Sequence, residues 1–175
     1  MQLTYYPNPI LTQVCPPAEP PREPVTSPRT GKELPSLWRE MAKSMWKIMA
    51  DNDGVGLAAP QVGVSTRMFV WRQNGGFEAI WNPQLSCLSG EMKSVEGCLS
   101  LPRVFVALTR ATSSIMTGIG MNGLPLRLIG DESVTRIWQH EIDHLDGKLI
   151  IDQMSKDQTA INRKALRRLL KKAAT

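Results

Sequence analysis

The chain has 175 residues, of which 42% are hydrophobic and 21% charged, a composition typical of a globular protein with one hydrophobic core. No apolar run approaches the roughly 20 residues that a membrane-spanning helix needs, and the first ten residues lack the basic start and apolar core of a signal peptide. An odd number of cysteines, three, without an export signal argues against a disulfide framework, so we expect a cytoplasmic protein, with organellar and viral origins also compatible.

Basic charge is concentrated at one end of the chain. The formal net charge is +5, yet no acid follows Asp157. The basic residues beyond it are Arg163, Lys164, Arg167, Arg168, Lys171 and Lys172. The remainder of the chain is nearly neutral, so the charge suggests a partner for the tail only, and we expect neither DNA nor membrane binding.

The first 63 residues are expected to contain one helix between two irregular segments. Residues 15–35 are rich in proline, which lacks the amide donor used in helices and sheet interiors, and they predict an extended surface loop. Residues 36–53 predict a helix with Ser36 as its N-cap. Its apolar face is expected to pack in the core through Leu37, Met41, Met45, Ile48 and Met49. GVGLAAPQVG (54–63) is typical of a loop of small residues.

The rest of the chain predicts strands followed by two helices. Residues 66–71, 77–86 and 103–119 are rich in Val, Ile, Phe and Trp, and glycine-containing turns are predicted at 74–76, 89–90 and 121–123. Asp131 or Ser133 can cap a helix through residues 133–147, which Gly147 would end. Residues 159–175 predict a basic amphipathic helix. Its apolar stripe would consist of Ile161, Ala165, Leu166, Leu169 and Leu170.

Both histidines of the chain lie in the hexapeptide QHEIDH, residues 139–144. On a helix, His140 and His144 share one face a turn apart, so both imidazoles can bind a single metal ion. Glu141 projects beside them, where it can reach a metal-bound water without being a ligand. This H-E-x-x-H spacing is typical of metal-dependent hydrolases, in which the metal lowers the pKa of the water towards about 7 and the glutamate takes its proton.

A catalytic site of this kind needs a third protein ligand. No glutamate or histidine follows the hexapeptide, which disfavours a metallopeptidase that cuts internal peptide bonds but leaves carboxylates for it at Asp146, Asp152 and Asp157. Cys98, in SVEGCLSLP, is the upstream candidate, although alone it is more simply a small buried hydrophobe. An RNA- or ribosome-binding protein with a structural metal is a third hypothesis, which the unpaired spacing of Cys15 and Cys87 disfavours.

The order of the elements predicts one catalytic domain over residues 1–175. A helix, several strands and two further helices follow one another without strand–helix alternation, which favours the α+β class. We therefore expect mostly antiparallel sheets packed around a central metal-binding helix, with a C-terminal helix added to them.

Three motifs, in this order, resemble those of the peptide deformylases: GVGLAAPQ (54–61), EGCLS (96–100) and QHEIDH (139–144). YPNPIL near the start and WNPQL (81–85) extend the resemblance over most of residues 5–152. This family is metal-dependent and removes the formyl group from the formylmethionine that begins new polypeptides. The resemblance implies that metal-bound hydroxide attacks the formyl carbon while a glutamate acts as general acid/base.

The resemblance also implies roles for individual residues. The metal ligands would be Cys98, His140 and His144, with Glu141 as the general acid/base. The oxyanion would be stabilised by the side-chain amide of Gln61 and the backbone N–H of Leu99. The substrate would be held by Val55, Gly56, Gly97 and Ile137. Polar residues that brace the site would be Arg110, Gln139 and Asp143.

The metal and the partners follow from the same resemblance. It implies one divalent ion, with Fe²⁺ as the expected native metal and Zn²⁺, Ni²⁺ or Co²⁺ as alternatives, because a Cys/His₂ set suits several of these ions. The substrates would be N-formylmethionyl peptides. Because these peptides emerge from the ribosome, the basic helix suggests contact with ribosomal RNA phosphates; the alternative is a solvated helix whose apolar stripe simply packs on the domain. We expect a monomer.

Two stretches depart from the pattern of the family. The proline-rich segment 16–30 is longer than the segment that the family usually carries between its first strand and first helix. Phe105 stands seven residues after Cys98, where some members have an arginine that lines the substrate cleft. The contacts with the substrate beyond the methionine are therefore expected to differ in this chain.

Overall fold

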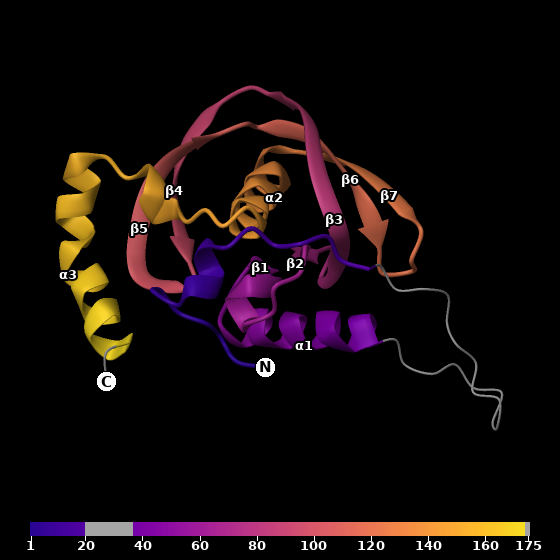
Figure 1. Cartoon of the computed structure of the whole chain (residues 1–175). Coiled ribbons are helices and arrows are strands. Elements are labelled where there is room, and N and C mark those ends of the chain that lie inside the picture. The colour runs from indigo at the N-terminus through magenta and orange to yellow at the C-terminus, as the bar shows by residue number, and fades with distance from the viewer. Residues whose placement is uncertain (20–36, 174–175) are drawn as a thin grey trace.

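The computed structural model describes residues 1–19 and 37–173 (Figure 1). The elements, with 3-10 helices written η, are η1 (Pro9–Thr12), α1 (Leu37–Asp51), β1 (Gly56–Ala58), η2 (Ala59–Val62), β2 (Met68–Gln73), β3 (Gly76–Ser89), β4 (Met92–Cys98), β5 (Leu101–Arg110), β6 (Ser113–Gly120), β7 (Pro125–Gly130), α2 (Glu132–Leu145), η3 (Ile150–Gln153) and α3 (Lys156–Ala173). Every strand pairing among them is antiparallel. The predicted α+β class is confirmed.

The larger sheet has five strands in the order β1-β2-β3-β6-β7. Its longest strand, β3, contains two register shifts, one between Trp81 and Gln84 and one between Ser86 and Ser89. Bulges of this kind add an unpaired residue and bend the strand. Figure 1 shows the result: β3 and β6 arch over α2 and do not run flat beside it.

The smaller sheet is the hairpin of β4 and β5. Gly97 pairs with Phe105 and Cys98 pairs with Leu101, so residues 99 and 100 form a tight turn at the end of the hairpin. The register shifts between Gly97 and Cys98, which re-aims the side chain that follows the shift. The hairpin therefore presents Cys98 at its tip, beside α2.

Helix α2 lies between the two sheets (Figure 1). Its predicted cap is confirmed, because Asp131 Oδ1 accepts a hydrogen bond of 3.1 Å from the backbone N–H of Val134. Gly147, with φ +70°, follows the last turn as predicted. Trp138 and Leu145 pack with buried residues of the larger sheet, and this packing fixes which face of the helix turns towards the hairpin.

Helix α1 packs against the larger sheet through Met45 and Met49, which are fully buried as predicted. Trp46 stacks on Phe77 with ring centroids 5.1 Å apart. The prediction was wrong for Leu37, which is 87% exposed because it lies in the first turn of the helix, beyond the edge of the core.

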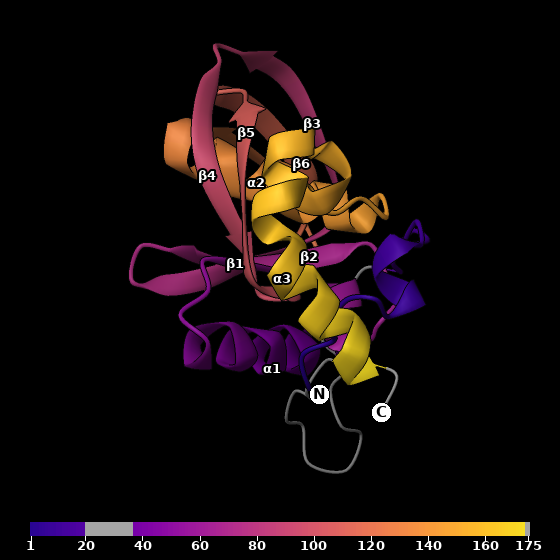
Figure 2. The ribbon, with the colours of Figure 1, turned by 90° about the vertical axis from the view of Figure 1, so that its left-hand side faces the viewer.

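Helix α3 crosses the outer side of the hairpin (Figure 2). It begins at Lys156, three residues before the predicted start. Asn162 and Leu169 are the buried positions of the helix, whereas Ile161 and Leu170 are 79% and 46% exposed. The predicted stripe was therefore wrong at Ile161 and Leu170: the helix turns Asn162, a polar residue, towards the domain instead.

The structure also differs from the predicted strands and loops. Strands β1, β4 and β7 were not predicted, and the predicted strand region 103–119 divides into β5 and β6, which belong to different sheets. At the described start of the proline-rich segment, Pro16, Pro17 and Glu19 are exposed and irregular as predicted, whereas Cys15 and Ala18 are buried. Asn82 holds Ala18 by accepting from its N–H at 2.7 Å and donating to its carbonyl at 2.8 Å. The remainder of the segment and the predicted cap Ser36 lie outside the described residues. Among the described helices, none combines the length and apolar character required to span a bilayer.

Candidate active site

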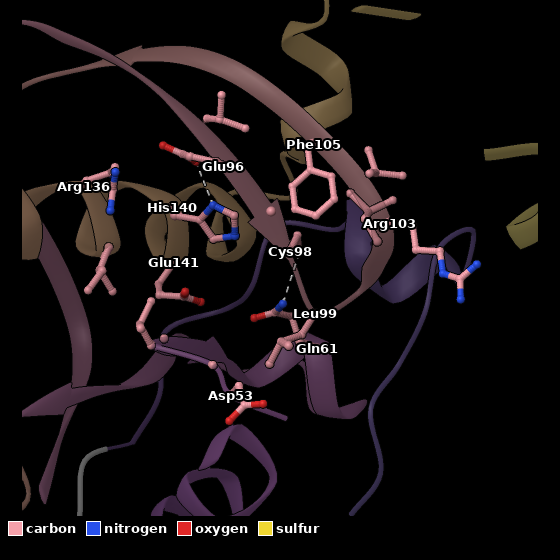
Figure 3. Close-up of a pocket in the computed structure, with 18 residues that line it drawn as sticks. Asp53, Gln61, Glu96, Cys98, Leu99, Arg103, Phe105, Arg136, His140 and Glu141 are labelled. Carbon is pink, nitrogen blue, oxygen red and sulfur yellow. Dashed lines mark hydrogen bonds and ion pairs between the residues drawn. The ribbon is translucent and has the colours of Figure 1, made fainter. Parts of the chain in front are cut away.

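The site is built where one face of α2 meets the tip of the β4–β5 hairpin (Figure 3). His140 and His144 lie one turn apart on α2, and their ring centroids are 5.0 Å apart. The Cys98 Sγ lies 3.2 Å from the His144 Nε2. The ligand atoms of Cys98, His140 and His144 all lie within 4.8 Å of one another.

This group fits a divalent metal ion. Three bonds of about 2.0–2.3 Å to one ion require ligand atoms at such mutual distances. A thiolate and two imidazoles suit the transition metals, and the hard cations Ca²⁺ and Mg²⁺ prefer oxygen. By contrast, Asp146 is paired with Arg67 at 2.8 Å, and Asp152 accepts from the backbone N–H of Leu149 at 2.7 Å. The aspartate ligands of a metallopeptidase are therefore not the residues that gather here.

The surroundings of Cys98 favour its thiolate form. Burial would raise the pKa of the Cys98 thiol, but the neighbouring His144 and His140 outweigh burial and lower that pKa to about 5. Burial also works against a charged His140, while its hydrogen bonds to Cys98 and Glu96 raise the pKa of His140 well above its ordinary value. The thiolate of Cys98 and a protonated His140 thus stabilise one another by opposite charge.

Glu96 fixes the ring of His140. His140 Nδ1 lies 2.9 Å from Glu96 Oε2, and Arg110 grips both oxygens of the same carboxylate at 2.9 and 3.0 Å. Burial alone would raise the pKa of Glu96, but the hydrogen bonds from His140 and Arg110 outweigh burial and lower this pKa to about 2. An ionised carboxylate can only accept, so Nδ1 carries the proton and leaves the Nε2 lone pair for a metal.

The three polar residues that the resemblance suggested as bracing residues make hydrogen bonds between α2 and its neighbours. Arg110 Nη1 also donates to Asp143 Oδ2 at 2.6 Å, which links the hairpin to α2. Gln139 accepts from the backbone N–H of Ala111 and donates to its carbonyl, both at 3.1 Å, at the junction of β5 and β6. Of these three residues, Gln139 and Asp143 lie on α2 itself and Arg110 lies at the end of β5. Sequence reasoning missed Glu96, although it opens the EGCLS motif.

Glu141 is a buried carboxylate with an unused oxygen. It is 3% exposed, and its Oε2 has no hydrogen-bond partner among the described residues. Burial raises the pKa of Glu141 to about 7. A Cβ added at Gly56 would overlap the Glu141 carboxylate and would lie 2.9 Å from Ile137 Cγ2. The glycine therefore leaves the room that this carboxylate occupies.

Gln61 lies below Cys98 in Figure 3, and a hydrogen bond joins the two side chains. Its Oε1 accepts from the backbone N–H of Ala58 at 2.8 Å, which fixes the orientation of the amide. The Nε2 then donates to Cys98 Sγ at 3.4 Å and to Ser100 Oγ at 3.3 Å. A buried neutral donor thus faces the ligand group from η2, at the end of the GVGLAAPQ motif.

An open cleft of about 330 Å³ leads to these groups. Of the predicted residues, its lining includes Val55, Gly56, Gln61, Gly97, Cys98, Leu99, Ile137, His140 and Glu141. His144, Arg110, Gln139 and Asp143 do not line it. The sequence did not single out Asp53, Arg103 or Arg136 of the lining, because isolated charged residues outside a motif give no signal of a shared cleft.

Comparisons with known proteins agree with this geometry. Residues 1–160 match the family model described as polypeptide deformylase. The peptide deformylase of Acidothermus cellulolyticus is 41% identical over 147 residues, which cover 84% of this chain and 78% of that protein. The peptide deformylase of Acidobacterium capsulatum is 36% identical over 155 residues, covering 86% and 84%.

Solved structures give the same result. A peptide deformylase from Legionella pneumophila superposes with a TM-score of 0.81 at 29% identity and covers 99% of this chain and 96% of that one. A peptide deformylase from Thermus thermophilus gives a TM-score of 0.81 at 30% identity, with 98% of each chain covered. With three motifs gathered at one cleft and these likenesses over nearly its whole length, the chain belongs to the polypeptide deformylase family of enzymes.

Proposed function

We propose that this enzyme removes the formyl group from the N-terminal formylmethionine of nascent polypeptides, with one divalent metal ion held by Cys98, His140 and His144. The observation that carries the proposal is the convergence of these three ligand atoms within 4.8 Å, at a cleft that also contains a buried carboxylate, Glu141. When bound, such an ion supplies a Lewis acid and lowers the pKa of water.

Glu141 is proposed as the general acid/base. Its raised pKa, about 7, means that it can both take a proton from the attacking water and give one to the leaving amine near neutral pH. The unpartnered Oε2 is the atom free to do so. The carboxylate thus shuttles one proton from nucleophile to leaving group while formate is released.

The oxyanion that forms on attack needs donors that do not ionise. The Gln61 amide meets this requirement, because Ala58 fixes its oxygen and the Nε2 faces Cys98. The backbone N–H of Leu99, in the turn at the hairpin tip, is proposed as the second donor. Val55, Gly56, Gly97 and Ile137 line the cleft and are proposed to hold the backbone of the substrate and its methionine.

Fe²⁺ is proposed as the native metal. A thiolate ligand of low pKa is readily oxidised once an ion that shields it is lost, so purification in air would favour Zn²⁺-loaded or inactive enzyme. Metal analysis and activity after anaerobic purification test this choice. Full activity of an iron-free, zinc-loaded preparation would contradict it.

One assay tests the proposed function. The enzyme is incubated with formyl-Met-Ala-Ser, and both formate and new free amine are measured. We expect the two to appear in equal amounts, with no cleavage of the Met-Ala bond. Cleavage of internal bonds without release of formate would instead identify a peptidase. If no product of either kind formed, the protein would have a binding role only.

We also propose that α3 contacts the ribosome. Arg163, Lys164, Arg167 and Arg168 are exposed on α3, where they form a cationic surface suited to RNA phosphates. Replacing all four with glutamate should abolish co-sedimentation with ribosomes and spare activity on a formyl-Met peptide. Unchanged co-sedimentation of the variant would show that this surface is not the contact.

A further inference from the structure

Phe105 is a large apolar side chain that the cleft leaves uncovered. It is 61% exposed and lines the same cleft as Cys98 and Glu141 (Figure 3). A Cβ added to Gly97, its partner across the hairpin, would lie 3.2 Å from Phe105 Cε1. The ring therefore lies against the bare backbone of residue 97, one residue from the Cys98 ligand.

The apolar surface continues along the hairpin away from the ligand group. Val95 pairs with Ala107, and side chains two residues apart on a strand share a face, so Val95 and Ala107 lie on the same face as Phe105. Val95 is 65% exposed. The alternate residues, Val104 and Val106, are buried in the core on the other face. An apolar strip thus leads outwards from Cys98.

The position of Phe105 is fixed from α3 by a buried amide. Asn162 is 5% exposed; its Oδ1 accepts from the Phe105 N–H at 3.1 Å, and its Nδ2 donates to the Phe105 carbonyl at 2.9 Å. Gln158 Nε2 donates to the Ala107 carbonyl at 3.0 Å, one residue pair further along. Side chains of α3 therefore occupy the edge of β5 that β4 leaves open, as a third strand would.

We propose that Phe105 is a specificity-determining residue of this enzyme, which binds an apolar side chain of a residue that follows the formylmethionine, and that Asn162 positions it. The inference rests on the proposed deformylase activity. If the formyl group of the substrate lies at the ligand atoms, the substrate residues after the formylmethionine must lie along the walls of the cleft. An apolar side chain of the substrate would bury the exposed Phe105 ring, and this burial of apolar surface stabilises the complex. A polar side chain would gain less from the same contact.

The test compares formyl-Met-Ser-Ser with formyl-Met-Phe-Ser and formyl-Met-Ser-Phe by their rates of formate release. For the wild-type enzyme we expect kcat/KM to be about tenfold higher for at least one phenylalanine peptide, mainly through a lower KM. In Phe105→Ala this ratio should fall to within about twofold of unity. A ratio that survives the substitution overturns the proposal.

The role of Asn162 is tested by a double-mutant cycle. Asn162→Ala should lower the phenylalanine preference in the wild-type background and leave it unchanged in the Phe105→Ala background, because the two residues act as one unit. Ile161→Ala, the neighbouring exposed position on α3, is the matched control and should keep the preference. An equal effect of Asn162→Ala in both backgrounds would refute the positioning role.

Failure of this inference is distinct from failure of the proposed function. If formate is released from all three peptides at equal rates, the enzyme is a deformylase and Phe105 does not select its substrate. If formate is released from none, the proposed function itself is wrong. Purely structural damage by Asn162→Ala would lower kcat/KM for the three peptides alike, and the ratio used here would not change.

Discussion

At the scale of single residues, the proposed chemistry depends on a carboxylate that is almost fully buried. Glu141 lies beside His140 and His144, but its Oε2 makes no hydrogen bond within the described part of the chain. Gly56 makes this arrangement possible, because any side chain there would meet the carboxylate. The glutamate of the HExxH motif therefore has its room because a glycine from a different part of the sequence lies beside it.

Glu141→Gln should separate catalysis from metal binding. The amide has nearly the shape of the carboxylate, so the ligand group stays intact, but it cannot take a proton. We expect the metal content to be unchanged and kcat to fall by a factor on the order of 10²–10⁴. Metal analysis and formate release check this, and near-normal turnover of the metal-loaded variant would exclude Glu141 as the base.

Gly56→Ala should displace the carboxylate without unfolding the protein. The added methyl would collide with the Glu141 side chain and approach Ile137 within 2.9 Å. A displacement of about 1 Å from the productive position costs roughly 10²-fold in rate. Gly76→Ala is the matched control, since its nearest neighbour would be 3.8 Å away. Equal kcat for the two variants would contradict the account of Gly56.

The two histidines could be predicted as ligands from the sequence because their pattern is local, whereas Cys98 was assigned only through the resemblance and Glu96 was missed. The spacing of His140 and His144 is a property of one helix. The role of Glu96 arises only when the hairpin folds beside α2, so that its carboxylate lies between His140 and Arg110. The resemblance suggested Arg110 and Asp143 as bracing residues, and Glu96 is the acid that joins them to the metal site.

At the scale of elements, α2 must begin at a fixed residue if His140 and His144 are to face Cys98 at the tip of the hairpin. The backbone N–H of Val134, then the Ser133 hydroxyl, lower the pKa of the Asp131 carboxyl. A pKa lowered on folding means that the ionised cap stabilises the protein at neutral pH and that this contribution is lost as the pH falls through the folded-state pKa.

Asp131→Asn should reveal this dependence. Asparagine caps helices as well as aspartate does, but it does not titrate. We expect wild type to have the higher Tm at pH 7, since its charge also favours the helix N-terminus, and the difference to vanish in acid. Thermal unfolding of both proteins between pH 7 and pH 3 measures it. A difference that grows on acidification would contradict the cap.

The strands that were not predicted are those whose own residues lack a typical strand pattern. Strand β4, MKSVEGC, contains glycine and several polar residues, and it is a strand because β5 pairs with it. Strand β7 begins with Pro125 and lies at a sheet edge, where proline is tolerated. In α3, the apolar pattern suggested a stripe through Ile161, but Asn162 faces the domain because β5 offers it two backbone partners.

At the scale of the whole molecule, the three cysteines are placed in three different environments. Cys87 is exposed, Cys15 is buried, and Cys98 lies in the ligand group. Burial raises the pKa of the Cys15 thiol, while the pKa of Cys98 is lowered to about 5. The reactivity of the three cysteines towards thiol reagents should therefore show whether a metal ion is bound at Cys98.

A thiol titration of the folded enzyme should depend on the metal. With an ion bound, we expect one rapidly reacting thiol per chain, Cys87, since the ion shields the thiolate of Cys98. After removal of the ion with a chelator, the count should rise to two, and Cys15 should react only on unfolding. Mass spectrometry of the modified peptides assigns the sites. A count that stays at one after chelation would contradict the assignment of Cys98.

The most direct measurement is the metal content per chain of Cys98→Ala, with Cys87→Ala as the matched control. Our proposal is that Cys98 of the hairpin and the two histidines of α2, His140 and His144, bind one ion together. The account predicts about one ion per chain in wild type and Cys87→Ala, and a large loss of metal in Cys98→Ala, whose fold is retained. Full metal occupancy in Cys98→Ala would contradict it.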